Sequence, residues 1–368
     1  MGSEIKPSIE CNHLHCRTRM RLGIDLSSFL YGKAVGFNEY ALSLVEGLAS
    51  IPSDELELTL FVRAGQAPHF RGIHSSAAIR EIPFNGEFAR LAWHHVVPWF
   101  LQRRFDAFLF PANFAPLLVP SNSTVVVHDL NFLSNTQSFG RANLLYRHLI
   151  QRSSIRRCLG AIAISRTTAL EVERYAGRLP EVIHNAVRVR PPRGVGAENL
   201  ILCASSLSHH KNIPAAHGAC LQLVEEDPSV SVCFIGNWRA DQFPASRQHP
   251  RIRLLGFVSD QERLQLLAAC RAVLAPSFYE GFGMPYIEAL ICRKALICSD
   301  IPIAREVVDD YPYWIQPPFG PAEVLAALRY AKGLGFAPKE YPPELERRYE
   351  PESVARSYVR YLAMHARG

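Results

Sequence analysis

The segment Arg271–Leu290, "RAVLAPSFYEGFGMPYIEAL", combines the features that indicate the fold of this chain. "RAVLAPS" has the continuous apolar character of a buried strand, "FYEGFGMP" forms a glycine-containing loop, and the residues that follow have helical spacing. Pro285 suits the first turn of a helix, where a missing backbone N–H is not needed. Such a helix start exposes free N–H groups, and Gly281 and Gly283 allow a ligand to approach the backbone closely. The segment therefore predicts an anion site at a strand–helix junction.

Strand-like and helix-like segments alternate along most of the chain. The apolar runs are continuous, as in parallel sheets that are covered by helices on both faces. A stretch without periodicity, "RVRPPRGVGAEN", separates two such series. We therefore predict two doubly wound, Rossmann-like α/β domains with a cleft between them. The expected divisions are a disordered leader (1–19), an N-terminal domain (20–190), a linker (191–199), a C-terminal domain (200–345) and a final helical segment (346–368).

Composition excludes several classes of protein. The 368 residues carry a net charge of +6, which fits an anionic ligand or surface but is weak on its own. The nine cysteines show no disulfide rhythm and are interpreted as free thiols in a reducing cytoplasm. We find no apolar run long enough to cross a bilayer and no signal peptide, so a soluble or membrane-surface protein is expected. The cluster "CNHLHC" (Cys11, His13, His15, Cys16) is too tightly spaced for the usual zinc sites.

Candidate site residues lie where strands are expected to end. Ligands of open parallel sheets bind beyond the carboxyl ends of the strands. His128 ends "VVVHDL", Lys211 lies in "SSLSHHKN", and Glu280 and Glu288 flank the glycine-containing loop. Each has an alternative interpretation: a structural histidine, a solvated lysine, or a pair of acids used as in glycosidases.

At this point the motifs resemble a known family. E-G-F-G-x-P-x-x-E-A is similar to the E-x7-E signature of the family-four (group 1) retaining glycosyltransferases with the GT-B fold. "SLSHHKN", "VVVHDL", "VIHNAV" and "GFNEYALSLVEGLA" resemble further segments of that family, so the likeness extends from about Arg21 to the C-terminus. It implies that the N-terminal domain binds the acceptor, that the C-terminal domain binds a nucleotide sugar, and that the last helix crosses back to the N-terminal domain.

The resemblance also implies roles for individual residues. Glu288 is expected to accept hydrogen bonds from ribose hydroxyls and Glu280 from hydroxyls of the donor sugar, while Lys211 meets the diphosphate. His128 and Glu280 are the expected catalytic residues. Ser206 stands where many relatives have an arginine, which raises the alternative of a decayed, non-catalytic binding subunit. The full expected donor site is Gly36, Ser206, Lys211, Val258, Gly281, Phe282, Gly283, Met284, Pro285 and Glu288.

The function implied is transfer of a sugar, with a GDP-mannose-like donor favoured, to a glycan or lipid-linked acceptor in surface polysaccharide or lipopolysaccharide synthesis. A hydrolase or epimerase that acts on nucleotide sugars is the alternative enzyme. No Asp-x-Asp pair occurs in the sequence, so neither a metal nor another cofactor is expected. Nucleic acid binding is not expected, because no recognition motif accompanies the positive charge.

Two basic segments suggest a cytoplasmic protein at the inner face of a membrane. Residues 141–157 contain five arginines and no acid, and "HHVVPWFLQRRF" places Trp99 and Phe100 beside Arg103 and Arg104. Basic and aromatic residues in this arrangement are typical of contact with anionic lipid. An ordinary amphipathic helix with a solvated basic face fits the same pattern.

Overall fold

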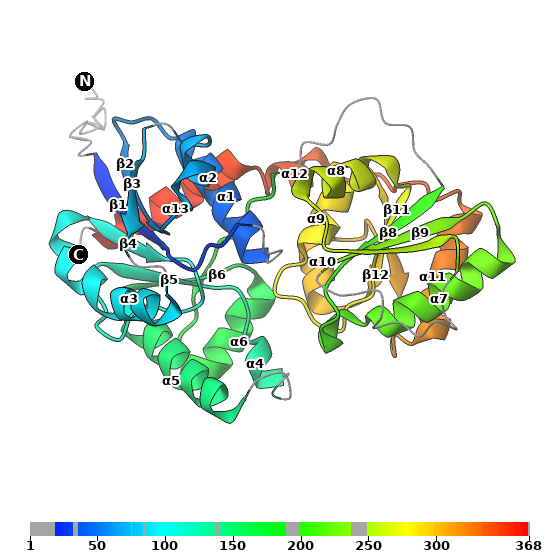
Figure 1. Ribbon diagram of the computed structural model, residues 1–368, viewed down its shortest axis with the longest axis horizontal. Coiled ribbons are helices and arrows are strands. Elements are labelled where there is room, and N and C mark those ends of the chain that lie inside the picture. Colours follow the sequence, from blue (N-terminus) through cyan, green and yellow to red (C-terminus); the bar gives the residue numbers. More distant parts are fainter. Residues whose placement is uncertain are drawn as a thin grey trace, which may run out of the picture.

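The computed structural model describes residues 19–31, 36–74, 76–83, 86–134, 136, 140–188, 199–236 and 249–366. These residues form two lobes side by side, each built on a parallel sheet (Figure 1). All of the expected leader except Arg19, and all of the expected linker except Asn199, lie outside the described residues, as does the "CNHLHC" cluster.

The N-terminal sheet has the strand order β3-β2-β1-β4-β5-β6-β7, and all its described pairs are parallel. The strands are β1 (Met20–Leu26), β2 (Leu56–Arg63), β3 (Ala78–Ile82), β4 (Ala107–Phe110), β5 (Ser123–Val127), β6 (Gly160–Ala163) and β7 (Glu181–Val182). The helices are α1 (Gly36–Ala49), α2 (Ala67–Arg71), α3 (Glu87–Leu101), α4 (Asn131–Ser134), α5 (Arg141–Arg157) and α6 (Arg166–Ala176), with the 3-10 turn η1 (Gln102–Arg104) after α3.

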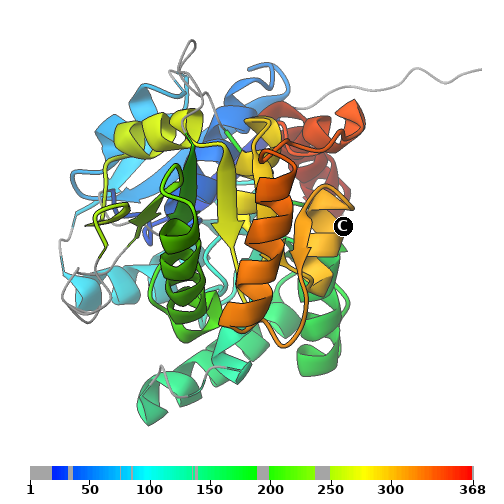
Figure 2. The ribbon, with the colours of Figure 1, turned by 90° about the vertical axis from the view of Figure 1, so that its right-hand side faces the viewer.

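The C-terminal sheet repeats this arrangement with the order β10-β9-β8-β11-β12-β13, again parallel throughout its described pairs. Its strands are β8 (Leu200–Ala204), β9 (Ser231–Ile235), β10 (Ile252–Gly256), β11 (Ala272–Ala275), β12 (Ala295–Ser299) and β13 (Tyr313–Ile315). Its helices are α7 (Ile213–Glu226), α8 (Asp260–Ala269), α9 (Met284–Ile291), α10 (Pro302–Val308), α11 (Pro321–Gly333) and α12 (Pro343–Arg347), with the 3-10 turn η3 (His209–Lys211). Figure 2 shows α7 and α11 side by side over the outer face of this sheet. Two doubly wound α/β domains are thereby confirmed.

The last helix, α13 (Pro351–Ala366), returns to the N-terminal domain and packs along α1 (Figure 1). The Tyr358 hydroxyl lies 3.0 Å from the Tyr40 hydroxyl of α1, and Tyr361 accepts a hydrogen bond from the Ala161 N–H of β6. Gly47 permits this approach, because a Cβ at that position would overlap the Pro351 carbonyl. The chain therefore crosses between the lobes twice.

One of the clusters of buried apolar side chains runs across both lobes. It includes Leu22 and Ile24 of β1, Leu202 of β8, and Tyr286 and Ile287 of α9. Such continuity indicates that the two domains are packed against one another and not merely tethered. Within the described part of the chain, no helix combines the length and apolar character that a bilayer crossing requires.

Candidate functional site

The C-terminal sheet brings two charged residues together at its topological switch point. The chain runs outward from β8 to β10 and then returns to β11, on the other side of β8, and ligands of such sheets bind at this point. Lys211 follows β8 and Glu280 follows β11. The Lys211 Nζ lies 2.6 and 2.7 Å from the two Glu280 carboxylate oxygens, and the Ser277 hydroxyl donates to one of them at 2.8 Å. The two predicted residues therefore share one place at the cleft.

The glycine-containing loop ends at the first turn of α9. Gly283 has φ +84° as the N-cap of this helix, a conformation that favours glycine, and Met284 and Pro285 form the first turn. The first N–H groups of a helix lack intrahelical acceptors, so this turn offers donors to an anion. The loop is fastened to the Lys211 loop, because the Phe278 N–H donates to the His210 carbonyl at 2.8 Å.

Glu288, one turn into α9, is buried and held by an arginine that the sequence did not single out. The Arg263 guanidinium on α8 lies 2.5 Å from Glu288 and 3.1 Å from Asp260. It also lies 3.9 Å from Glu39 of α1, across the domain boundary. The charge of Glu288 is the main reason why the pKa of Arg263 is raised. Arg263 lies on the same helix face as the buried residues Leu267 and Cys270. A charged residue on an otherwise apolar face indicates a buried partner of opposite charge, and this signal was present in the sequence.

His128 follows β5 and lies against α1. Its Nε2–H donates to the Pro111 carbonyl at 2.6 Å, and its backbone N–H donates to the Asn113 side chain at 2.6 Å. Burial lowers the pKa of His128, so the ring is neutral, with Nδ1 as its acceptor nitrogen. The ring of Tyr40 packs edge-on at 4.5 Å between centroids.

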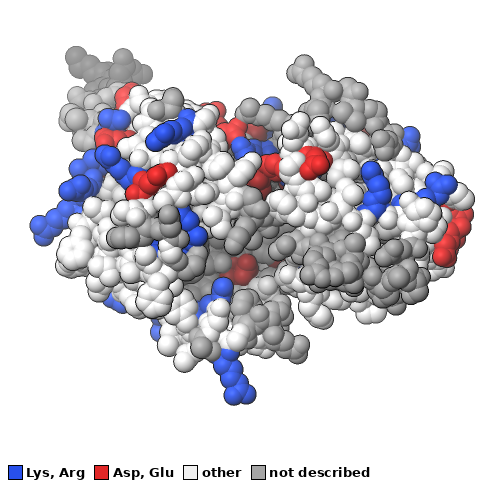
Figure 3. Space-filling model, in the orientation of Figure 1, with Lys and Arg blue, Asp and Glu red and all other residues white. Residues whose placement is uncertain are grey.

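The glycine-containing loop between β11 and α9, residues 276–283 (the donor loop), touches the His128 segment directly. A Cβ at Gly281 would overlap the His128 carbonyl, so glycine is required there for close contact between the domains. His128, Gly281, Glu280 and Lys211 therefore form one group of neighbours. A space-filling view shows a hollow between the two lobes, with acidic side chains beside it (Figure 3).

The remaining predicted residues surround this group less closely. Gly36 is the first residue of α1, next to Phe37, whose ring centroid is 6.0 Å from that of His128. Phe282 is buried beside Gly281. The Ser206 hydroxyl lies 3.0 Å from the Ser208 hydroxyl, and Val258 packs against the core just before the α8 N-cap Ser259.

A second buried pair, which the sequence did not reveal, lies in the N-terminal domain. The His94 Nδ1 on α3 is 2.5 Å from the Asp25 carboxylate near the end of β1, and both side chains are 3% exposed. Burial would raise the pKa of Asp25, but the imidazole and the Ser27 hydrogen bonds outweigh it and lower the pKa. The loop after β4 links this pair to His128, since Phe110 and Phe114 contact His94 edge-on while Pro111 and Asn113 bind His128.

Within the described segments, no group of three or more His, Cys, Asp or Glu side chains is arranged to hold a metal ion. The described cysteines are free, and all but Cys292 are buried. Burial raises the pKa of Cys203 to about 12, so this thiol is protonated at neutral pH.

Comparison with known proteins finds similarity to glycosyl transferases. Residues 190–332 match the sequence model of the family Glycosyl transferases group 1. The O-antigen chain mannosyltransferase B of Escherichia coli is 48% identical over 59 residues, which are 16% of each chain. The O-antigen chain mannosyltransferase RfbU of Salmonella typhimurium is 27% identical over 213 residues, 55% of this chain and 58% of that protein. The match lies in the C-terminal domain, which is thus similar to the group 1 glycosyl transferases.

These alignments span less than two thirds of the length of either mannosyltransferase. The structural similarity covers a larger share of the chain. Anabaena HepE, solved in complex with UDP-glucose, superposes with a TM-score of 0.70 and 17% identity, covering 94% of this chain and all of that one. The two lobes of this chain therefore have the GT-B fold.

Proposed function

We propose that this chain is a retaining, metal-independent glycosyltransferase that moves a hexose from a nucleoside diphosphate sugar to a glycan or lipid-linked acceptor. The observation that carries the proposal is the meeting of Lys211 and Glu280 at the switch point of the C-terminal sheet, beside the first turn of α9. A cation and a helix start suit a diphosphate, and a carboxylate next to them suits sugar hydroxyls.

Donor binding requires these side chains to exchange partners. Lys211 turns from Glu280 to the diphosphate, which frees Glu280 to accept hydrogen bonds from the donor sugar. Glu288 accepts from the ribose diol while Arg263 fixes its orientation from the other side. His128 accepts a hydrogen bond from a hydroxyl of the donor sugar at Nδ1, because its Nε2–H already donates to the Pro111 carbonyl.

Transfer breaks the bond between the anomeric carbon and the diphosphate oxygen and forms a bond from that carbon to the acceptor oxygen on the same face. The acceptor proton passes to the departing phosphate oxygen. Lys211 and the N–H groups of α9 stabilise the charge that develops on the leaving group, so no metal is needed in this scheme.

We favour mannose as the sugar and GDP-mannose as the donor, since both named sequence relatives are mannosyltransferases of O-antigen chains. The UDP-glucose complex of HepE makes UDP-glucose the main competitor to test. A lipid-linked O-antigen-like glycan is the favoured acceptor class.

Contact with a membrane would suit such an acceptor. The neighbouring helices α3 and α5, joined by the His95–Tyr146 hydrogen bond, expose Phe100 (68%), Leu145 (61%) and Leu149. Arg103 and Arg104 are exposed at the end of α3, and Figure 3 shows basic side chains at the outer edge of this lobe. Apolar side chains beside cations suit an anionic lipid surface at the cytoplasmic face.

The test is a transfer assay with GDP-mannose and UDP-glucose, with and without lipid-linked glycans, read by mass spectrometry and by NMR of the anomeric proton. Acceptor-dependent product with the donor's anomeric configuration, undiminished by EDTA, is expected. Release of free sugar that is indifferent to acceptor would identify a hydrolase. Absence of turnover despite nucleotide binding would identify a binding subunit, and activity restored only by a divalent cation would contradict the metal-independent scheme.

A further inference from the structure

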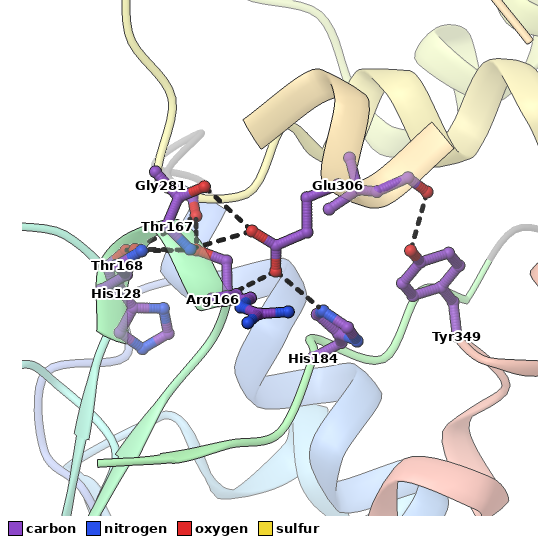
Figure 4. A network of polar contacts seen from close by, with 10 residues as sticks. His128, Arg166, Thr167, Thr168, His184, Gly281, Glu306 and Tyr349 are labelled. Atoms are coloured by element: carbon purple, nitrogen blue, oxygen red, sulfur yellow. Dashed lines mark hydrogen bonds and ion pairs between the residues drawn. The ribbon is translucent and has the colours of Figure 1, made fainter. Parts of the chain in front are cut away.

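A half-buried carboxylate from the C-terminal domain caps a helix of the N-terminal domain. Glu306, on α10, has a side chain that is 16% exposed. It accepts hydrogen bonds from the backbone N–H groups of Arg166 and Thr167 at 2.5 and 2.9 Å, and from the Thr167 hydroxyl at 2.9 Å. Figure 4 shows Glu306 pointing from α10 toward these donors at the start of α6.

The capped turn also holds the donor loop. Ser165, the N-cap of α6, donates from its hydroxyl to the Gly281 carbonyl at 3.0 Å. The Thr168 hydroxyl lies 3.4 Å from both the Gly281 and the His128 carbonyls. One helical turn therefore contacts Glu306, the donor loop and the His128 segment together.

A histidine completes the arrangement on the other side. His184 Nε2 lies 3.2 Å from Glu306, and the His184 ring lies 6.0 Å from the Phe282 ring of the donor loop. Burial would raise the pKa of Glu306, but the hydrogen bonds from His184, Arg166 and Thr167 lower it. The carboxylate is thus ionised at neutral pH and accepts hydrogen bonds from every one of these neighbours.

We propose that Glu306 is a positioning residue that, through the first turn of α6, sets the donor loop against His128 across the domain boundary. It is not among the residues proposed above to contact the donor. A carboxylate suits this role because it accepts several hydrogen bonds and is attracted to the positive end of α6. As a statement about catalysis, the inference rests on the proposed glycosyltransferase function; as a statement about domain contact, it does not.

Two readouts on Glu306→Gln test it. Hydrogen exchange followed by mass spectrometry should show exchange at least about tenfold faster in the α6 peptide and in the donor-loop peptide around Gly281. The amide keeps the size of the side chain but presents an N–H₂ group to donors and lacks the charge. Turnover should fall roughly ten- to a hundredfold, because small misplacements of reacting groups have effects of this size. Affinity for the bare nucleoside diphosphate should stay within about twofold, since Glu306 is outside that site.

Glu226→Gln is the matched control. Glu226 pairs with Arg329 between α7 and α11, so its substitution removes the same charge from the same domain without touching the boundary. It should leave turnover and both peptides unchanged. Glu306→Asp, which keeps the charge, should recover part of the protection and of the turnover.

The outcomes separate this inference from the proposed function. If the natural chain transfers no sugar but Glu306→Gln loosens both peptides, the domain contact stands and the glycosyltransferase proposal fails. If the chain transfers sugar and Glu306→Gln changes neither exchange in the donor loop nor turnover, the positioning role is wrong. Loosening throughout the C-terminal domain would likewise overturn it, because Glu306 would then act only on the stability of its own domain.

Discussion

The two domains share a strand order, yet they carry different chemistry beyond the ends of equivalent strands. In the C-terminal domain, the loops after β8 and β11 bring Lys211 and Glu280 into an ion pair at the cleft. In the N-terminal domain, the equivalent strands are β1 and β4, and in the polar pair near them, Asp25 with His94, both side chains are 3% exposed. A polar ligand can therefore replace either member of the Lys211–Glu280 pair as a hydrogen-bond partner. It cannot easily reach the buried Asp25–His94 pair.

This difference suggests that the two domains have different roles although they share a fold. In the function proposed here, the charges of Lys211 and Glu280 in the C-terminal domain are redirected to an anionic donor. In the N-terminal domain, burial lowers the pKa of His128, and the Asp25–His94 pair is buried away from solvent. The contrast predicts that substitutions in the N-terminal pair act on stability, whereas those at the C-terminal pairs act on binding and turnover.

The largest expected effect is on the free energy of unfolding and comes from the buried Asp25–His94 pair. Asp25→Ala leaves a buried imidazole without its partner, and loss of one member of a buried pair lowers stability by about 3–5 kcal/mol. Because the pKa of Asp25 is lowered in the folded chain, the stabilisation is present above the unfolded-state pKa of about 3.9 and fades as the pH falls through the folded-state value. Urea titrations should therefore show a gap between natural chain and variant that is full at pH 7 and shrinks below about pH 4. A gap that persisted unchanged in acid would contradict this.

Next come His128 and Glu280, which belong to different domains and meet across the boundary. His128→Ala and Glu280→Ala should each reduce turnover about a hundredfold, a loss of about 2.7 kcal/mol, because both act on the donor sugar in the chemical step. Affinity for the bare nucleoside diphosphate should not fall in calorimetry, since that ligand lacks the sugar. Near-normal turnover in either variant would show that its residue is structural.

Glu288 gives a smaller effect on binding. Glu288→Ala removes the proposed acceptor of the ribose diol, and loss of hydrogen bonds to a charged group costs about 1.5–3 kcal/mol. Calorimetry should show roughly ten- to a hundredfold weaker binding of the nucleoside diphosphate. Arg263 retains Asp260 as a partner, so the loss of affinity should exceed the loss of unfolding free energy. Unchanged affinity would refute the assignment.

The sequence predicted the site best where the residues that form it follow one another closely in the chain. The strand, loop and helix read from Arg271–Leu290 correspond to β11, the donor loop and α9, because every cue lies within one short segment. Arg263, His94 and Glu306 were missed because their partners are remote: Glu306 binds the backbone of a residue 140 positions earlier. β3 and β13 were missed as well. β3 is largely exposed and β13 has three residues, so neither leaves a clear apolar run.

The smallest expected effects come from two serines, one in each domain, that cap helices. Ser259 caps α8 through a capping box that is closed locally, since its hydroxyl accepts from the Glu262 N–H and Glu262 accepts in return from the Ser259 N–H. Ser165 caps α6 through the Thr168 N–H and also reaches Gly281 of the other domain. Replacing either cap by alanine should lower the free energy of unfolding by about 1 kcal/mol.

Only one of the two serines should affect catalysis. Ser259→Ala should leave turnover within about twofold, whereas Ser165→Ala removes a hydrogen bond that holds the donor loop and should slow turnover several-fold, in keeping with a contact of about 0.5–1.5 kcal/mol. Steady-state kinetics beside urea titration distinguish the two effects, because both variants lose a helix cap but only Ser165→Ala also loses the hydrogen bond to Gly281. Equal turnover in both variants would mean that the Ser165–Gly281 bond only packs the domains together. A selective loss at Ser165 would show that the N-terminal domain shapes the donor site with a single hydroxyl.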